Sequence, residues 1–108
     1  MTPFLATNLS TTVTSVFSSQ AGYLEAIEVY NPSDAAAFVQ IFDAGAIGDV
    51  TLNTTVPNLS IGMETLTHTQ LSNLHCYFAR GCQIAATTTA TGNSAPSAGL
   101  IVNLIVST

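Results

Sequence analysis

The sequence predicts an all-β fold: a single-domain antiparallel β-sandwich or jelly roll of about seven to eight short strands. Two observations support this prediction. Segments rich in β-branched and aromatic residues recur along the chain, and turn-forming residues separate them about every 8–12 residues. No internal repeat or linker interrupts the pattern, and 108 residues suit one domain that is long enough to bury a core.

Three strands are expected in the first part of the chain. Met1–Ser10 is expected to be an N-terminal arm, ordered only where something holds it, so the sandwich domain should cover residues 11–108. Thr11–Ser18 has the Thr, Val and Phe content of a strand. Tyr23–Asn31 fits a helix or a strand by pattern alone, but its aromatic and β-branched residues before Asn-Pro-Ser-Asp favour a strand. Ala36–Asp43 is apolar on both faces, and these last two strands are expected to pair as a hairpin.

The middle of the chain is less regular. Ala44–Val50 is a loop with two glycines, and Thr51–Gly62 is a polar connection in which Pro57 would restrict any strand to a sheet edge. Met63–Leu71 is expected to form another strand, in which Met63, Thr65 and Thr67 lie on one face and Glu64, Leu66 and His68 lie on the other. Asn73–Phe78 then leads into the last pair of strands.

The last third of the chain is expected to form a second hairpin. Gly81–Thr89 alternates with the period of two that is typical of a half-buried strand, and Ala90–Ser97 has the Gly, Pro, Asn and Ser content of a loop. Leu100–Val106 returns as a strand whose even-numbered residues should face the core. Its opposite face carries Ile101 and Ile105, so this strand needs a cover on both sides, from its own domain or from a neighbouring subunit.

The composition excludes several partners. Charged residues make up 6% of the chain, against about a quarter in ordinary domains. The chain has one arginine, no lysine and six carboxylates, which gives a net charge of −5. Nucleic acid is excluded because its phosphate backbone requires several cationic side chains. No segment has the ~20 consecutive apolar residues that span a membrane, and the N-terminus lacks the pattern of a secretory signal. A surface of Thr, Ser, Asn and Ala suits a protein that packs against neighbours.

The spacing of reactive side chains predicts no catalytic, metal or cofactor site. Asp43 and Asp49 flank a glycine-containing loop but lack the closely spaced oxygen ligands of a calcium loop. No nucleophile elbow and no glycine-rich phosphate loop is present, so an enzyme is not expected. Four side chains hold the atom types that bind zinc, but their spacing matches no compact zinc pattern. These are His68, His75, Cys76 and Cys82.

The two cysteines allow two interpretations. Cys76 and Cys82 are six residues apart, so a disulfide could clip a short turn. The simpler interpretation is two small buried thiols, because Cys82 falls on the expected inward face beside Ile84.

Four stretches carry a resemblance to a known group of proteins. They are Gly22–Asn31 (GYLEAIEVYN), Phe38–Ala44 (FVQIFDA), Gly81–Gly92 (GCQIAATTTATG) and Gly99–Val106 (GLIVNLIV). In this order they resemble segments of small structural proteins of tailed bacteriophages. The resemblance covers the chain from about Gly22 onward, and Cys82 stands where an aliphatic residue is expected. It implies a β-sandwich protein of the virion.

The resemblance and the composition together suggest a capsid cement (decoration) protein. Such proteins are commonly homotrimers that clamp neighbouring copies of the major capsid protein. The expected mechanism is burial of β-sheet surface between subunits, without a chemical reaction. The arm Thr2–Asn8 is expected to contact a neighbouring subunit. Arg80, the only cation, is open between a salt bridge across a subunit contact and a solvated side chain. The residues expected at interfaces are Thr2, Pro3, Phe4, Phe38, Phe42, Arg80, Ile101 and Ile105.

Two alternatives remain at this stage. One is a tail, collar or fibre component with the same fold, in which Asn53–Ser60 and Ala90–Ser97 face a receptor. The other is a carbohydrate-binding module, in which Tyr23, Tyr30 and Tyr77 supply a stacking platform. The absence of tryptophan weakens the second alternative.

Overall fold

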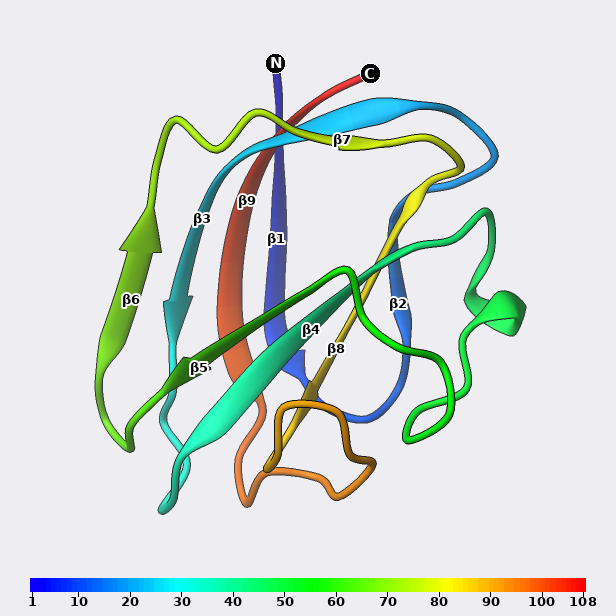
Figure 1. Ribbon diagram of the computed structural model, residues 1–108. Coiled ribbons are helices and arrows are strands. Elements are labelled where there is room, and N and C mark those ends of the chain that lie inside the picture. Colours follow the sequence, from blue (N-terminus) through cyan, green and yellow to red (C-terminus); the bar gives the residue numbers. More distant parts are fainter.

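A computed structural model describes residues 1–108 and shows a molecule built almost entirely of strands (Figure 1). The only helical element is η1, a short 3-10 turn over Ile47–Asp49, and no helix is long and apolar enough to cross a membrane. The nine strands are β1 (Thr2–Leu9), β2 (Thr14–Phe17), β3 (Gly22–Tyr30), β4 (Ala37–Asp43), β5 (Leu59–Met63), β6 (His68–Leu71), β7 (Cys76–Phe78), β8 (Cys82–Thr87) and β9 (Leu100–Ser107).

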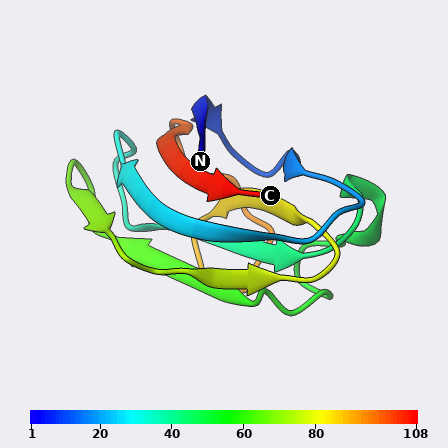
Figure 2. The ribbon, with the colours of Figure 1, turned by 90° about the horizontal axis from the view of Figure 1, so that it is seen from above.

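The strands form two antiparallel sheets that lie face to face (Figure 2). In the five-stranded sheet the order is β1-β9-β3-β6. The fifth strand, β7, lies on the same side of β3 as β6: β7 pairs with the first half of β3 and β6 with the second half. In the four-stranded sheet the order is β2-β8-β4-β5. The chain therefore crosses repeatedly from one sheet to the other, which is the arrangement of a jelly roll. The predicted fold class is confirmed.

The expected hairpin of the second and third strands is wrong, although both strands exist. β3 belongs to the five-stranded sheet and β4 to the four-stranded sheet. The segment between them forms a corner in which Asn31 is fully buried. The Asn31 side chain donates a hydrogen bond to the Ala35 carbonyl (2.9 Å) and accepts one from the Ser33 N–H (3.0 Å). A turn signal thus marks where the chain bends, but this bend leads across the sandwich.

The expected C-terminal hairpin is wrong for the same reason. β8 pairs with β2 and β4, whereas β9 pairs with β1 and β3, and the loop between them crosses the sandwich. The loop itself lies where it was expected. The prediction that Gly81–Thr89 forms a half-buried strand is also wrong, because all six residues of β8 are buried.

The first ten residues are part of the sandwich and do not form an arm. β1 pairs with β9 from Thr2 opposite Val106 to Leu9 opposite Leu100, so the domain begins at residue 2 rather than at residue 11. Phe4 and Ala6 pack against the core, and Leu9 is 2% exposed. Apolar burial and pairing with β9 therefore hold this segment to its own chain.

The middle of the chain differs from expectation in its strand boundaries. The expected strand over Met63–Leu71 is divided: Met63 ends β5, a turn follows, and β6 begins at His68. β5 is an edge strand that starts shortly after Pro57, as the proline predicts.

The main core fills the space between the sheets and contains 17 buried residues. All four even-numbered residues of β9 belong to it, as predicted from their alternation. A second, smaller cluster of Phe42, Ala44 and Val50 lies on the outer side of the four-stranded sheet, where the segment containing η1 covers it. The outer side of the five-stranded sheet has no comparable cover.

Candidate functional site

The candidate site is the outer face of the five-stranded sheet. We use this name for the residues whose side chains point away from the core along these strands. They are Pro3, Leu5, Tyr23, Glu25, Ala26, Glu28, Tyr30, His68, Gln70, Tyr77, Ile101, Asn103, Ile105 and Ser107. Of the eight large apolar residues that are exposed in the molecule, Met1, Leu5, Leu71, Tyr77 and Ile101 lie on this face or at its edge. Exposed apolar side chains are thus concentrated on one side of the sandwich.

Strand register sets which residues of the outer face are neighbours. Asn103 of β9 lies between Leu5 of β1 and Glu28 of β3, and Glu28 pairs in turn with Gln70 of β6. The register of β3 against β9 shifts between Leu24 and Ala26, as in a β-bulge. This shift places Glu25 and Ala26 next to each other on the outer face, although a regular strand would turn one of them inward.

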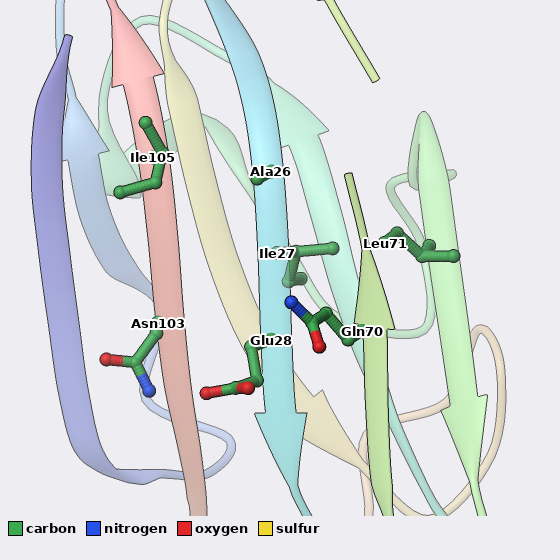
Figure 3. Close-up of a pocket in the computed structure, with 7 residues that line it drawn as sticks. All are labelled: Ala26, Ile27, Glu28, Gln70, Leu71, Asn103 and Ile105. Atoms are coloured by element: carbon green, nitrogen blue, oxygen red, sulfur yellow. The ribbon is translucent and has the colours of Figure 1, made fainter. Parts of the chain in front are cut away.

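A groove runs along the outer face between β3, β6 and β9 (Figure 3). Its volume is about 170 Å³, and its lining comprises Ala26, Ile27, Glu28, Gln70, Leu71, Asn103 and Ile105. We call it the Glu28 groove. The Glu28 side chain extends into the space between β3 and β9, on the side of Asn103 (Figure 3). The groove therefore combines a carboxylate and two carboxamides with apolar walls, and no Lys or Arg lines it.

A wider hollow adjoins the Glu28 groove and shares Ala26 and Ile105 with it. Its volume is about 500 Å³, and Met1, Glu25 and His75 are among the residues that line it. The groove and the hollow together make the outer face uneven, with room for side chains from outside the molecule.

Glu25 is held by a local network at the edge of this hollow. The Nδ1 atom of His75 lies 2.6 Å from one carboxylate oxygen, and the Ser107 hydroxyl donates a hydrogen bond of 2.9 Å to the other. These hydrogen bonds, chiefly that with His75, lower the pKa of Glu25 from its ordinary value. The His75 ring also stacks on Tyr23 at 4.1 Å and 7°. The His75–Glu25 contact is the only one in the chain that brings a His, Lys or Arg nitrogen within ion-pair distance of a carboxylate.

The structure brings together three of the eight expected interface residues. Pro3, Ile101 and Ile105 lie on the outer face, and Ile101 is 37% exposed. Thr2 and Phe4 lie on the opposite side of β1, where Phe4 packs against the core.

The remaining three interface candidates lie elsewhere. Phe42 is 1% exposed under its covering loop, so the expectation that it contacts a neighbour is wrong. Phe38 is partly buried on the four-stranded sheet, beside Gly62. Arg80 is exposed in the turn between β7 and β8, and its guanidinium makes no ion pair within the chain.

The candidate zinc and calcium ligands have other roles or none. No group of three His, Cys, Asp or Glu side chains is placed to hold a metal ion. The Asp43 carboxylate accepts hydrogen bonds from the backbone N–H groups of Ala79 (3.0 Å) and Arg80 (2.8 Å). Both cysteines are free thiols, and burial raises the pKa of Cys82 to about 12.

The three tyrosines of the expected stacking platform do not form one site. Tyr23 and Tyr77 are neighbours, with ring centres 5.3 Å apart, but one face of Tyr23 is already stacked on His75. Tyr30 lies near the other end of β3, where its ring centre is 4.7 Å from that of His68.

Sequence reasoning did not find the Glu28 groove or the Glu25 network. Leu5 lies within Thr2–Asn8, the stretch that was expected to contact a neighbour. The groove had no local signal, because it depends on the bulge in β3 and on the placement of β9 and β6 on the two sides of that strand.

Comparison with known proteins finds a structural likeness but no sequence match. No family model and no curated protein matches the chain. Among solved structures, the coat protein of tobacco streak virus is similar, with a TM-score of 0.47 and 9% sequence identity, over 98% of this chain and 86% of that protein.

Proposed function

We propose that this chain is a structural protein of a phage virion that assembles as a homotrimer and cements the capsid by binding the major capsid protein. The observation that carries the proposal is the uncovered outer face of the five-stranded sheet. This face gathers exposed apolar side chains in a chain that has a single cationic residue. Exposed apolar surface gathered on one side of a folded domain, among polar residues, is typical of a protein interface.

The size of this face is compatible with a stable contact. The molecule measures 35 × 28 × 18 Å, so a broad side of the sandwich offers roughly 1,000 Å², against the ~800 Å² that each partner contributes to a standard interface. The tyrosines on this face add to its suitability, because aromatic side chains are enriched in interface cores.

The fold agrees with the proposal without deciding it. Jelly rolls occur in viral capsid proteins and in lectins, so topology alone does not assign a function. The segmental resemblance to small phage structural proteins favours the first class. In this proposal the protein acts by burying surface and carries out no reaction.

Two further candidates concern where and what the protein binds. A tail, collar or fibre component would have the same fold and the same uncovered face. A carbohydrate-binding module finds support in the Tyr23–Tyr77 pair, since exposed aromatic rings provide stacking surfaces for sugars. Copy number separates the first from a cement protein, and glycan binding by the isolated chain identifies the second.

The test of the proposal is quantitative densitometry of purified virions against the major capsid protein. A copy number comparable to that of the major capsid protein supports a cement role. A few copies per particle would place the protein in the tail or neck, and its absence from virions would refute a virion role.

A second measurement tests the proposed surface. The purified chain should raise the melting temperature of capsid shells that lack it. Ile105→Asp should reduce this effect, because it places a charge in the apolar part of the outer face. Val56→Asp is the matched control, since Val56 is 79% exposed in the loop before β5, away from this face. Equal loss with both variants would contradict the assignment of the surface.

A further inference from the structure

The Glu28 groove has the chemistry of a receptor for a cationic side chain. The Glu28 carboxylate accepts no hydrogen bond and pairs with no cation of its own chain. Asn103 and Gln70 add two carboxamide oxygens that can accept further hydrogen bonds. The walls contributed by Ala26, Leu71 and Ile105 can cover an aliphatic stem.

The volume of the groove fits such a side chain. At about 170 Å³ it is more than ten times the ~10–15 Å³ that holds one water molecule on the same measure, so it can take a guanidinium together with its stem. A guanidinium carries five N–H donors in a planar fork, and it binds a carboxylate with two parallel hydrogen bonds.

The chain contains one side chain of this kind, and its position is well defined. Arg80 lies in the turn between β7 and β8 and is exposed without a carboxylate partner. Its backbone is tied from two sides: the N–H donates to Asp43 (2.8 Å), and the carbonyl accepts from the Gln20 N–H (3.1 Å). A turn that is already ordered loses little conformational freedom when it docks.

Arg80 cannot be expected to reach the groove of its own molecule. Glu28 lies six residues along β3 from Gly22, and Gly22 pairs with Phe78 just before the Arg80 turn. At about 3.3 Å per residue, this separates the two sites by roughly 20 Å, well beyond the length of an arginine side chain. The two complementary groups therefore lie on separate patches of one molecule.

We infer that the chain associates with a second copy of itself, with Arg80 of one subunit bound in the Glu28 groove of the next. This inference rests on the homo-oligomer part of the proposed function and names its contact. Because the two patches differ, the contact is head-to-tail. Head-to-tail contacts form rings such as a trimer when the rotation between subunits closes, and open filaments when it does not. The ion pair would form within the outer face, where removal from water strengthens it and makes its loss costly.

The experiment is a charge exchange followed by mass measurement in solution. Sedimentation equilibrium should show the wild type as a multimer of the 11.2 kDa chain. Arg80→Glu and Glu28→Arg should each weaken association by roughly 30-fold or more, because they place like charges in contact. The double variant Arg80→Glu/Glu28→Arg should recover the multimer. Asp49→Arg is the control for Glu28→Arg: it makes the same change of charge on η1, away from the outer face, and should leave the mass of the multimer unchanged.

Each other outcome counts against the inference. A monomeric wild type, a multimer that survives Arg80→Glu, or a double variant that stays monomeric would overturn it. Both residues are exposed, so folding should be preserved, and circular dichroism checks this. If a charge-reversed chain does not fold, Arg80→Gln and Glu28→Gln test the same pair. A wild-type monomer that still stabilises capsid shells would refute this inference but not the cement role. A multimer that forms through Arg80 and Glu28 but is absent from virions would support this inference and refute the cement role.

Discussion

Replacing Gly81 with alanine should destabilise the protein strongly, because the backbone at this position suits only glycine. Gly81 has a φ of +154°, a region that residues with a Cβ atom rarely adopt. A Cβ atom would also fall 2.5 Å from the Ala44 carbonyl oxygen and 2.8 Å from that of Phe17. Both neighbours are backbone atoms of the four-stranded sheet and its adjoining loop, so neither can rotate away.

The size of the effect follows from these contacts. The backbone conformation costs about 1–3 kcal/mol for a residue other than glycine. Moving the turn also weakens the hydrogen bonds from Ala44 N–H to Gly81 O (3.3 Å) and from Gln20 N–H to Arg80 O (3.1 Å), each worth about 1 kcal/mol. The loss in the free energy of unfolding should therefore be about 3–5 kcal/mol. At roughly 4 °C per kcal/mol for a domain of this size, the melting temperature should fall by roughly 12–20 °C.

Differential scanning calorimetry measures this change, and Gly48→Ala is the matched control. Gly48 lies in η1 with no atom within 4 Å of a built Cβ, so alanine there should be neutral or slightly stabilising. If Gly81→Ala melts within a few degrees of Gly48→Ala, the steric argument is wrong.

Three other predictions concern the core, the thiols and the Glu25 network. Phe42→Ala should lower the free energy of unfolding by about 3–5 kcal/mol in urea denaturation, because it empties a buried aromatic site, and the loss should not depend on protein concentration. In the native protein at pH 8, Cys76 should react with a thiol reagent, whereas Cys82, with a pKa of about 12, should react only after denaturation; two fast thiols would contradict this. Glu25 should titrate below 4.5 by NMR, and His75→Ala should raise its pKa toward the ordinary value. Because the folded pKa is lowered, the stability from Glu25 should be complete above about pH 4.5 and disappear as the pH falls through the folded pKa; a loss that begins at neutral pH would contradict the assignment.

The predictions from sequence were most successful for features that depend on a few neighbouring residues. The strands over Tyr23–Asn31 and Ala36–Asp43 lie within one residue of β3 and β4. The alternation in Leu100–Val106 correctly assigned the core side of β9, and it placed Ile101 and Ile105 on the other side. Side-chain alternation follows from the pleat of a single strand, so it can be recognised without knowing the partners of that strand.

Pairing was predicted poorly, because it depends on residues far apart in the chain. Thr2–Leu9 has the composition of a strand, but only β9, about a hundred residues later, provides its partner. Asn31 and the residues after it predict that the chain bends, but the same turn residues are compatible with a hairpin and with a crossing from one sheet to the other. Which of the two forms depends on the burial of Asn31 against the turn after β5, where its side chain donates to the Glu64 carbonyl (3.2 Å).

The sequence by itself determined the all-β class, the strand periodicity and which side chains of the last strand face away from the core. Those properties come from local propensity and from the alternation of apolar residues. The tertiary structure alone decided the jelly-roll order, the burial of Phe42 and the placement of Glu28, Asn103 and Gln70 around one groove. The physical reason is that strand order and register are chosen by the packing of the whole core, and a single bulge in β3 changes which side chains face outward.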